Sequence, residues 1–88
     1  MDSSDMAEGV RLGVEAEALL NSEIFNIAKV SASGEILEKL YSVDVASNEA
    51  GALELIRSLQ SMNRFIEQIE DIISDGKFLQ EQIKQTEN

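Results

Sequence analysis

The chain of 88 residues contains no cysteine, no histidine and no proline, and aromatic residues make up only 5% of it. Without cysteine there are no disulfides, and without cysteine or histidine there is no structural zinc site of the usual kind. A chain of this length buries only about 60–70% of its unfolded surface on folding, so a monomer without such additions is marginally stable. We therefore expect stabilisation by association with a copy of itself or with a partner protein.

Positive charge is scarce as well: seven Lys and Arg residues stand against 17 Asp and Glu residues, a formal net charge of −10. The cations are dispersed without a run, so we expect no direct binding of nucleic acid. The same charge disfavours an anionic membrane surface, and no run of about eighteen apolar residues is present to span a membrane. The first five residues include two aspartates and no cation, unlike a signal peptide. These features predict an intracellular protein that contacts no membrane.

No motif of a catalytic or metal site is found in the sequence. The side chains that most often transfer protons near neutral pH are missing, and the carboxylates fall on rows typical of a solvated helix face. There is no calcium loop, no glycine-rich phosphate loop and no nucleophile elbow. We predict a protein that is not an enzyme, with no catalytic residue, no cofactor and no metal. The acidic surface either recognises a basic protein or serves solubility alone.

The longest regular feature is an apolar stripe from Ala52 to Ile83, in which the separations alternate between three and four residues. An α-helix places such positions on one face. The heptad a positions are Ala52, Leu59, Ile66, Ile73 and Gln80, and the d positions are Leu55, Met62, Ile69, Gly76 and Ile83. A row at g, formed by Phe65, Ile72 and Leu79, widens the stripe. This width predicts a helix covered by more than one neighbour.

Capping signals divide the chain into three helices and a tail. We predict helices over about 5–20, 22–42 and 48–75, a tail over 77–84, and disorder at 1–4 and 85–88. Gly76 followed by Lys77 is the signal that ends the third helix. A connection as short as 42–48 normally joins antiparallel neighbours. The predicted fold is therefore all-α: one domain, 1–88, with a short N-terminal helix before a long antiparallel, coiled-coil-like helical hairpin.

Two predicted helices contain weak stretches. The apolar row of the first helix is Met6, Val10, Val14 and Ala18. Gly9 and Gly13 destabilise this helix, and although glycines four apart permit close helix contact, that motif is more typical of membranes than of water. In the second helix Ser31–Gly34 is a poor helix sequence, which either kinks the helix or divides it. We favour one helix with a weak centre.

The candidate interaction residues all lie on the long stripe: Leu59, Met62, Phe65, Ile66, Ile69, Ile72, Ile73 and Leu79. The g row either packs on the second helix within the monomer, which is the commoner case, or forms a surface for a partner. Arg57 and Arg64 lie one heptad apart on the outer face of the same helix. We expect them to pair with nearby carboxylates rather than with an external anion.

Several short segments resemble a group of small, largely uncharacterised helical proteins encoded in the genomes of tailed phages and prophages. The resembling segments are Ala16–Asn26, the mid-helix Arg64 and Ile72–Lys77, and the resemblance covers about residues 15–83. This chain departs from the group in its weak Ser31–Gly34 centre and in lacking a tryptophan near the end of the long helix. The resemblance implies a virus setting and a helical hairpin rather than an activity.

Together these features predict a structural or assembly protein of a phage, present in the host cytoplasm or in the virion, that associates with itself as a homo-oligomer and/or with another phage or host protein. The alternative is an acidic phage inhibitor or regulator that binds a basic surface of a host protein. Binding of that kind weakens steeply with salt, whereas association through the apolar stripe does not. A small terminase-like subunit is a third possibility, but the basic DNA-contacting helix that it needs is not visible.

Overall fold

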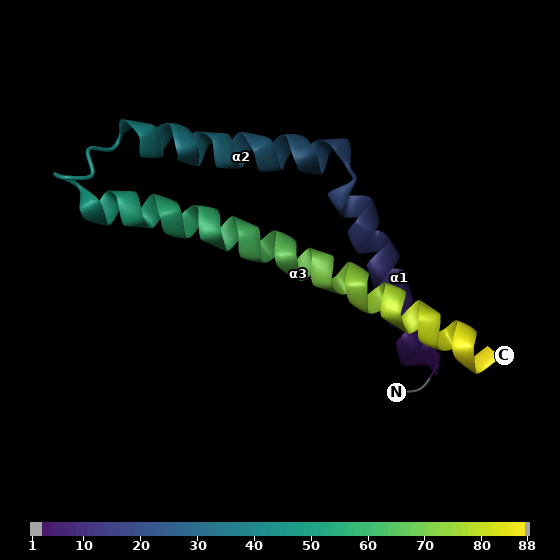
Figure 1. Ribbon diagram of the computed structural model, residues 1–88. Helices are drawn as coiled ribbons and strands as arrows, with labels where there is room; N and C mark the ends of the chain where they lie inside the picture. Colours follow the sequence, from purple (N-terminus) through teal and green to yellow (C-terminus); the bar gives the residue numbers. More distant parts are fainter. Residues whose placement is uncertain (1–2, 88) are drawn as a thin grey trace. The chain divides into compact units, whose positions relative to one another are not determined.

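The computed structural model describes residues 3–87, which form three α-helices and, within that range, no strand (Figure 1). The helices are α1, Ser3–Leu20, α2, Glu23–Ser42, and α3, Glu49–Glu87. The all-α prediction is confirmed. The chain divides into two compact units: unit 1 comprises Met1–Ser22 and Glu67–Asn88, and unit 2 comprises Glu23–Ile66. The long helix α3 therefore contributes to both units.

The third helix is longer than the sequence predicts. It continues through Gly76, whose φ is not in the left-handed region, so one helix replaces the expected end at residue 75 and the separate tail over 77–84. Gly76 is buried against α1, and this packing outweighs the low helix propensity of glycine. Residues 3–4 and 85–87, expected to be disordered, are helical. The same expectation for residues 1–2 and 88 lies outside the described residues.

The second helix runs without interruption through Ser31–Gly34. The Ser33 hydroxyl donates to the carbonyl oxygen of Lys29 at 2.9 Å and lies 3.3 Å from that of Val30. This serine is therefore satisfied by the preceding turn of its own helix, the usual arrangement for a serine in mid-helix. A Cβ placed on Gly34 would meet no atom within 4 Å. The centre of α2 is poor in helix propensity but continuous.

The third helix begins at a capped turn. The Asn48 side-chain oxygen accepts a hydrogen bond from the backbone N–H of Gly51 at 3.0 Å, which is the bond expected of an N-cap residue. Upstream, the Asp44 carboxylate accepts one from the N–H of Ala46 at 3.1 Å and closes the connecting segment. Asp44 thus stabilises the segment that connects α2 to α3, and Asn48 fixes the residue at which α3 begins.

Replacing Asn48 with alanine is expected to lower the free energy of unfolding by about 1 kcal/mol, because one N–H of the first turn loses its partner. Urea unfolding followed by far-UV circular dichroism measures this loss. Ser47→Ala is the matched control, since the Ser47 hydroxyl only donates to the Asp44 carbonyl of the same turn. Equal losses in the two variants would contradict the capping role of Asn48.

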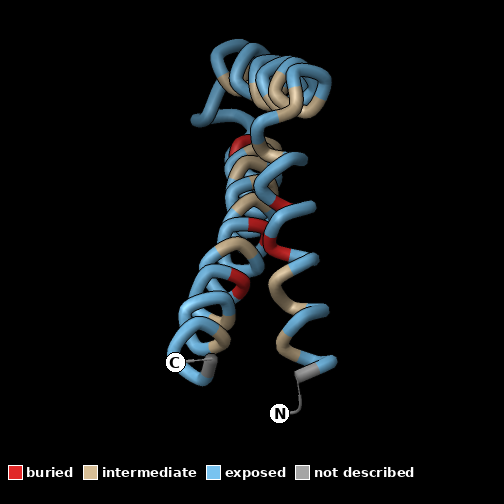
Figure 2. The backbone as a smooth tube through the Cα atoms, turned by 90° about the vertical axis from the view of Figure 1, so that its right-hand side faces the viewer, coloured by how far each residue is buried: buried red, intermediate tan, exposed pale blue. Residues whose placement is uncertain are grey.

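Unit 1 is held together by a close contact between two helix backbones. Gly13 and Gly76 are both buried, and a Cβ placed on Gly76 would lie 2.9 Å from the Gly13 Cα and 3.1 Å from the Gly9 carbonyl oxygen. Figure 2 shows the buried positions of α1 and of the C-terminal part of α3 facing one another. The covered row of α1 is Met6, Gly9, Gly13, Ala16 and Leu20. The backbones approach this closely because neither glycine has a side chain.

This row differs from the one predicted for the first helix. Met6 and Val10 are half-buried, but Val14 is 64% exposed and Ala18 is also exposed. The prediction was wrong because it ranked glycines as helix defects and followed the larger apolar side chains. The covered residues of α1 are at positions 6, 9, 13, 16 and 20, so their separations alternate between three and four residues. The same spacing identified the long stripe of the third helix.

In unit 2, α2 and the first part of α3 cover one another. On α3 the covered positions coincide with the predicted a and d positions: Ala52 is buried, and Leu55, Leu59, Met62 and Ile66 are half-buried. The half-buried positions of α2 are Phe25, Asn26, Lys29, Ser33, Ile36 and Leu40. The covered row of α2 is thus largely polar in its first half and apolar in its second half.

Candidate association surfaces

A groove of about 320 Å³ lies between α2 and α3 within unit 2. It is lined by Phe25, Ala28 and Lys29 of α2 and by Ser61, Met62, Phe65 and Ile66 of α3. The Phe65 side chain is 61% exposed, which is unusual for a phenylalanine beside an apolar groove. This groove, with its exposed aromatic ring, is the first candidate surface; we call it the unit 2 groove.

A second apolar groove, of about 360 Å³, lies within unit 1. Its lining residues are Leu12, Glu15, Ala16 and Leu19 of α1 and Ile69 and Ile72 of α3. Ile69 is buried at its base, whereas Ile72 is 43% exposed. We call it the unit 1 groove, and it is the second candidate surface.

The predicted interaction residues divide between these two units. Leu59, Met62 and Ile66 are half-buried in unit 2, and Ile69 is buried in unit 1, with Ile73 and Leu79 half-buried beside it. Phe65 and Ile72 are exposed. Of the g row, only Leu79 is covered: its side chain lies against Gly9 of α1. The expectation that the g row packs on the second helix is therefore wrong: Phe65 and Ile72 are exposed, and Leu79 packs on α1.

The outer face of α2 was not predicted from the sequence. Ile27, Val30, Leu37 and Tyr41 are all exposed, and Tyr41 is 88% exposed. Their separations of three, seven and four residues, with Gly34 between the middle pair, also place them on one face of the helix. The signal was present in the sequence as an apolar row at helical spacing, separate from the row of Ile36 and Leu40.

A wide hollow of about 710 Å³ is lined by the end of α2 and the beginning of α3, and both apolar and charged side chains contribute to it. Three carboxylates contribute to it, those of Glu35, Glu38 and Glu54, together with Lys39. Within residues 3–87, no group of three or more acidic side chains is placed to hold a metal ion. None of the described helices is both long and apolar enough to cross a membrane.

Charge is distributed unevenly between the units. By sequence, unit 1 carries eleven Asp and Glu residues against three Lys and Arg residues, a net charge of −8. Unit 2 carries six against four, a net charge of −2. Most of the excess negative charge therefore belongs to the helix pair that contains the glycine contact.

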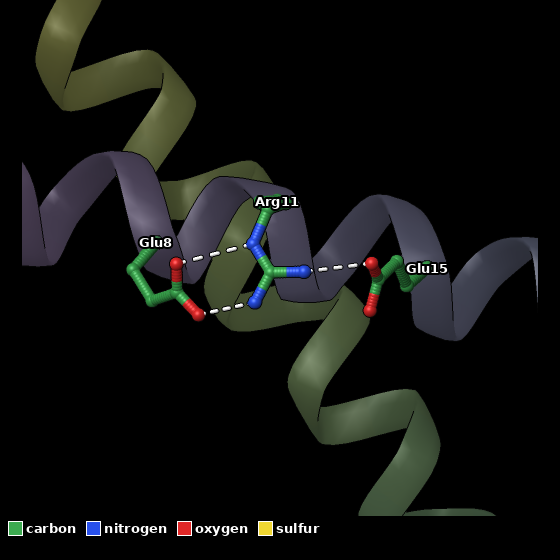
Figure 3. A network of polar contacts seen from close by, with 3 residues as sticks. All are labelled: Glu8, Arg11 and Glu15. Atoms are coloured by element: carbon green, nitrogen blue, oxygen red, sulfur yellow. Dashed lines mark hydrogen bonds and ion pairs between the residues drawn. The ribbon is translucent and has the colours of Figure 1, made fainter.

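One cation of unit 1 is held between two carboxylates on α1 (Figure 3). Arg11 donates to both carboxylate oxygens of Glu8, from Nε at 3.1 Å and from Nη2, and its Nη1 donates to Glu15 at 2.7 Å. The hydrogen bond from Arg11 lowers the pKa of the Glu8 carboxyl below its ordinary value. The same bond, with the charge of Glu15, raises the pKa of the guanidinium. All three side chains are more than half exposed, so the network adds little stability, and that contribution disappears as the pH falls through the lowered pKa of Glu8.

The cations of unit 2 are not paired in this way. Within residues 3–87, the ion pairs join Arg11 to Glu8 and Glu15 and Lys84 to Glu81, and none involves Arg57, Arg64 or Lys29. The expectation that Arg57 and Arg64 pair with nearby carboxylates is therefore wrong for the described residues. Both guanidinium groups are available to another molecule.

Comparison with models of protein families, with curated proteins and with solved structures gives no significant match for this chain.

Proposed function

We propose that this chain is a non-enzymatic protein that acts through association of its helices, first with a second copy of itself. One observation carries this proposal. Within the described residues, the buried hydrophobic side chains are those of Ala16, Ala52 and Ile69, and Ile69 is the only large one. Fourteen large hydrophobic side chains of the same region are exposed.

So small a core supports the monomer poorly. Burial of apolar surface is the main favourable term in folding, and a chain of this size has little of it to spare. Both units leave an apolar groove open, and the exposed side chains Phe65 and Ile72 stand at these grooves. Association through these surfaces would supply the missing burial.

We further propose that α2 and the first part of α3 form an antiparallel hairpin. The start of α2 shares the unit 2 groove with residues 61–66 of α3. The end of α2 shares the wide hollow with residues 48–55. The two helices therefore approach each other in opposite chain order within unit 2, as the short connecting segment favours.

A role in the structure or assembly of a phage particle fits a protein of this kind, with the host cytoplasm or the virion as its location. The support for this setting is the resemblance of residues 15–83 to small helical proteins of tailed phages. Association in copies is the property that such a role requires.

Replacing both Phe65 and Ile72 with glutamine tests the proposal. Each side chain is exposed in the isolated chain, so the substitutions are expected to leave helicity unchanged and to lower the thermal midpoint of the monomer by only a few degrees. Loss of two apolar anchors is expected to weaken self-association by about 2–3 kcal/mol, or roughly 100-fold in the dissociation constant. Light scattering over a range of protein concentrations measures this change.

Tyr41→Gln is the control for this experiment. Tyr41 is also an exposed aromatic residue, but it lines neither groove. The control is expected to keep the mass of the wild-type chain. If Tyr41→Gln dissociates the oligomer and the double variant does not, the association surface is the outer face of α2 and not the two grooves.

The concentration of negative charge in unit 1 supports a second candidate, an acidic inhibitor that occupies a basic surface of a host protein. This function predicts a different solution state: a monomer whose mass does not change with protein concentration. A monomer at all concentrations would favour this candidate over assembly.

A further inference from the structure

The unit 2 groove is formed by the two longest stretches of the chain that lack carboxylates. No acidic residue occurs between Glu23 and Glu35, or between Glu54 and Glu67. All the lining residues of the groove come from these two stretches. A chain with a net charge of −10 therefore presents one apolar groove without a carboxylate in its lining.

Cations border this groove. Lys29 lines it directly, and Arg57 and Arg64 lie four residues before and three residues after the lining residue Ser61. Residues at these separations are neighbours on one side of a helix. None of the three cations has an ion-pair partner within residues 3–87, and both arginines are exposed. The groove therefore favours an apolar ligand that carries negative charge.

Unit 1 has the complementary features. Its groove is apolar, with Glu15 in the lining, and Asp71 and Asp75 lie one residue before and three residues after the exposed Ile72. With Glu67 they form a row at intervals of four residues, and all three carboxylates are exposed. Repulsion within such a row is relieved by cations from outside. The row spans about 12 Å along the helix axis, enough to meet two arginines about 10 Å apart, as Arg57 and Arg64 are.

We propose that the unit 2 groove of one copy of this chain binds the unit 1 groove of a second copy. Phe65 inserts beside Ile72 of the other copy, and Arg57 and Arg64 pair with the carboxylate row. The inference rests on the proposed function, self-association, and specifies its two surfaces. An exposed aromatic anchor, a receiving apolar groove and a charged rim are the usual parts of a specific interface.

Charge reversal on each surface provides the test. One variant carries Arg57→Glu and Arg64→Glu, and the other carries Asp71→Lys and Asp75→Lys. Each alone is expected to lose self-association, with a dissociation constant raised roughly 100-fold, because like charges then face one another across the interface. All four positions are exposed and helical, so circular dichroism is expected to show unchanged helicity.

An equimolar mixture of the two variants gives the sharper result. Each variant retains one native surface, so the native groove of one fits the native groove of the other, and the two reversed surfaces also match. The mixture is expected to recover the mass of the wild-type oligomer by light scattering. If both variants stay folded and monomeric and their mixture stays monomeric too, the proposed pairing of surfaces is wrong.

The control variant Lys39→Glu with Lys84→Glu makes the same change in net charge as the arginine reversal, away from both grooves. It is expected to associate like the wild type, and an equal loss of association in this control would also overturn the proposal. Failure of the proposed function has a different signature. A monomeric wild-type chain would remove self-association itself, whereas a wild-type oligomer that the reversals leave intact would remove only this pair of surfaces.

Discussion

Replacing Gly76 with alanine is expected to destabilise unit 1 by about 2 kcal/mol, although alanine is the better helix former. In an open helix the substitution would contribute about 1 kcal/mol of stability. Here the new methyl group would lie 2.9 Å from the Gly13 Cα and 3.1 Å from the Gly9 carbonyl oxygen, both backbone atoms that cannot rotate away. The two helices must separate, and overpacking of this kind usually outweighs the gain in propensity.

Hydrogen exchange followed by mass spectrometry locates this effect. Protection is expected to fall in α1 and in residues 67–84 and to stay unchanged in α2. Gly34→Ala is the matched control, because a Cβ there would meet nothing within 4 Å, and it is expected to stabilise unit 2 by about 0.5–1 kcal/mol. A Gly76→Ala chain as stable as Gly34→Ala would show that the glycine contact is absent in solution.

The other large effect is expected at Ile69, the one large hydrophobic side chain that is buried within the described residues. Ile69→Ala is expected to lower the free energy of unfolding of unit 1 by about 3 kcal/mol, since it removes buried methyl groups and leaves a cavity. Ile72→Ala, three residues along the same helix, is expected to cost less, about 1 kcal/mol, because Ile72 is 43% exposed whereas Ile69 is buried. Urea unfolding of both variants measures the difference.

These two isoleucines also separate folding from association. A substitution at Ile69 destabilises unit 1 and so weakens every surface that depends on it. A substitution at Ile72 leaves the unit folded and removes a candidate contact. If Ile69→Ala and Ile72→Ala unfold at the same urea concentration, the burial difference described for unit 1 does not hold in solution.

Periodicity and capping residues predict much of this fold. The row from Ala52 to Gly76 identifies the covered face of α3, because apolar side chains at alternating intervals of three and four can only be buried together on a helix. Residue 48, where the third helix was predicted to begin, is the N-cap of α3: the Asn48 side-chain oxygen accepts a hydrogen bond from the Gly51 N–H. Local chemistry decides these features, and local chemistry is readable from the sequence.

The features that could not be predicted from the sequence depend on which residues of another helix pack against a given position. Gly76 has the local signals of a helix end, yet it stays helical because Gly13 of α1 packs against it. Gln80 was placed on the covered face, but it is exposed and Leu79 takes the covered position against Gly9. A strict heptad drifts around a straight helix of 3.6 residues per turn, so the residue that meets a neighbour depends on where the helices cross.

Candidate surfaces were harder to predict than elements. The sequence identified Phe65 and Ile72 as apolar residues on a helix, but only the packing of each unit shows that they remain exposed. The absence of carboxylates from the lining of the unit 2 groove was not predicted either, because it arises when two separate stretches of the chain pack together.

Because of the glycine contact, the attraction between α1 and α3 weakens quickly as the distance between the two helices increases. Gly9, Gly13 and Ala16 bring almost no side chain to the covered row, so little rotamer freedom is lost when α1 packs. Beside the burial of Ile69 and Leu79, part of the attraction comes from dispersion between closely spaced backbone atoms, and a gap of about 1 Å removes up to about half of each such contact. We therefore expect two main states of unit 1 and few between them: α1 packed against α3, and α1 separated from α3.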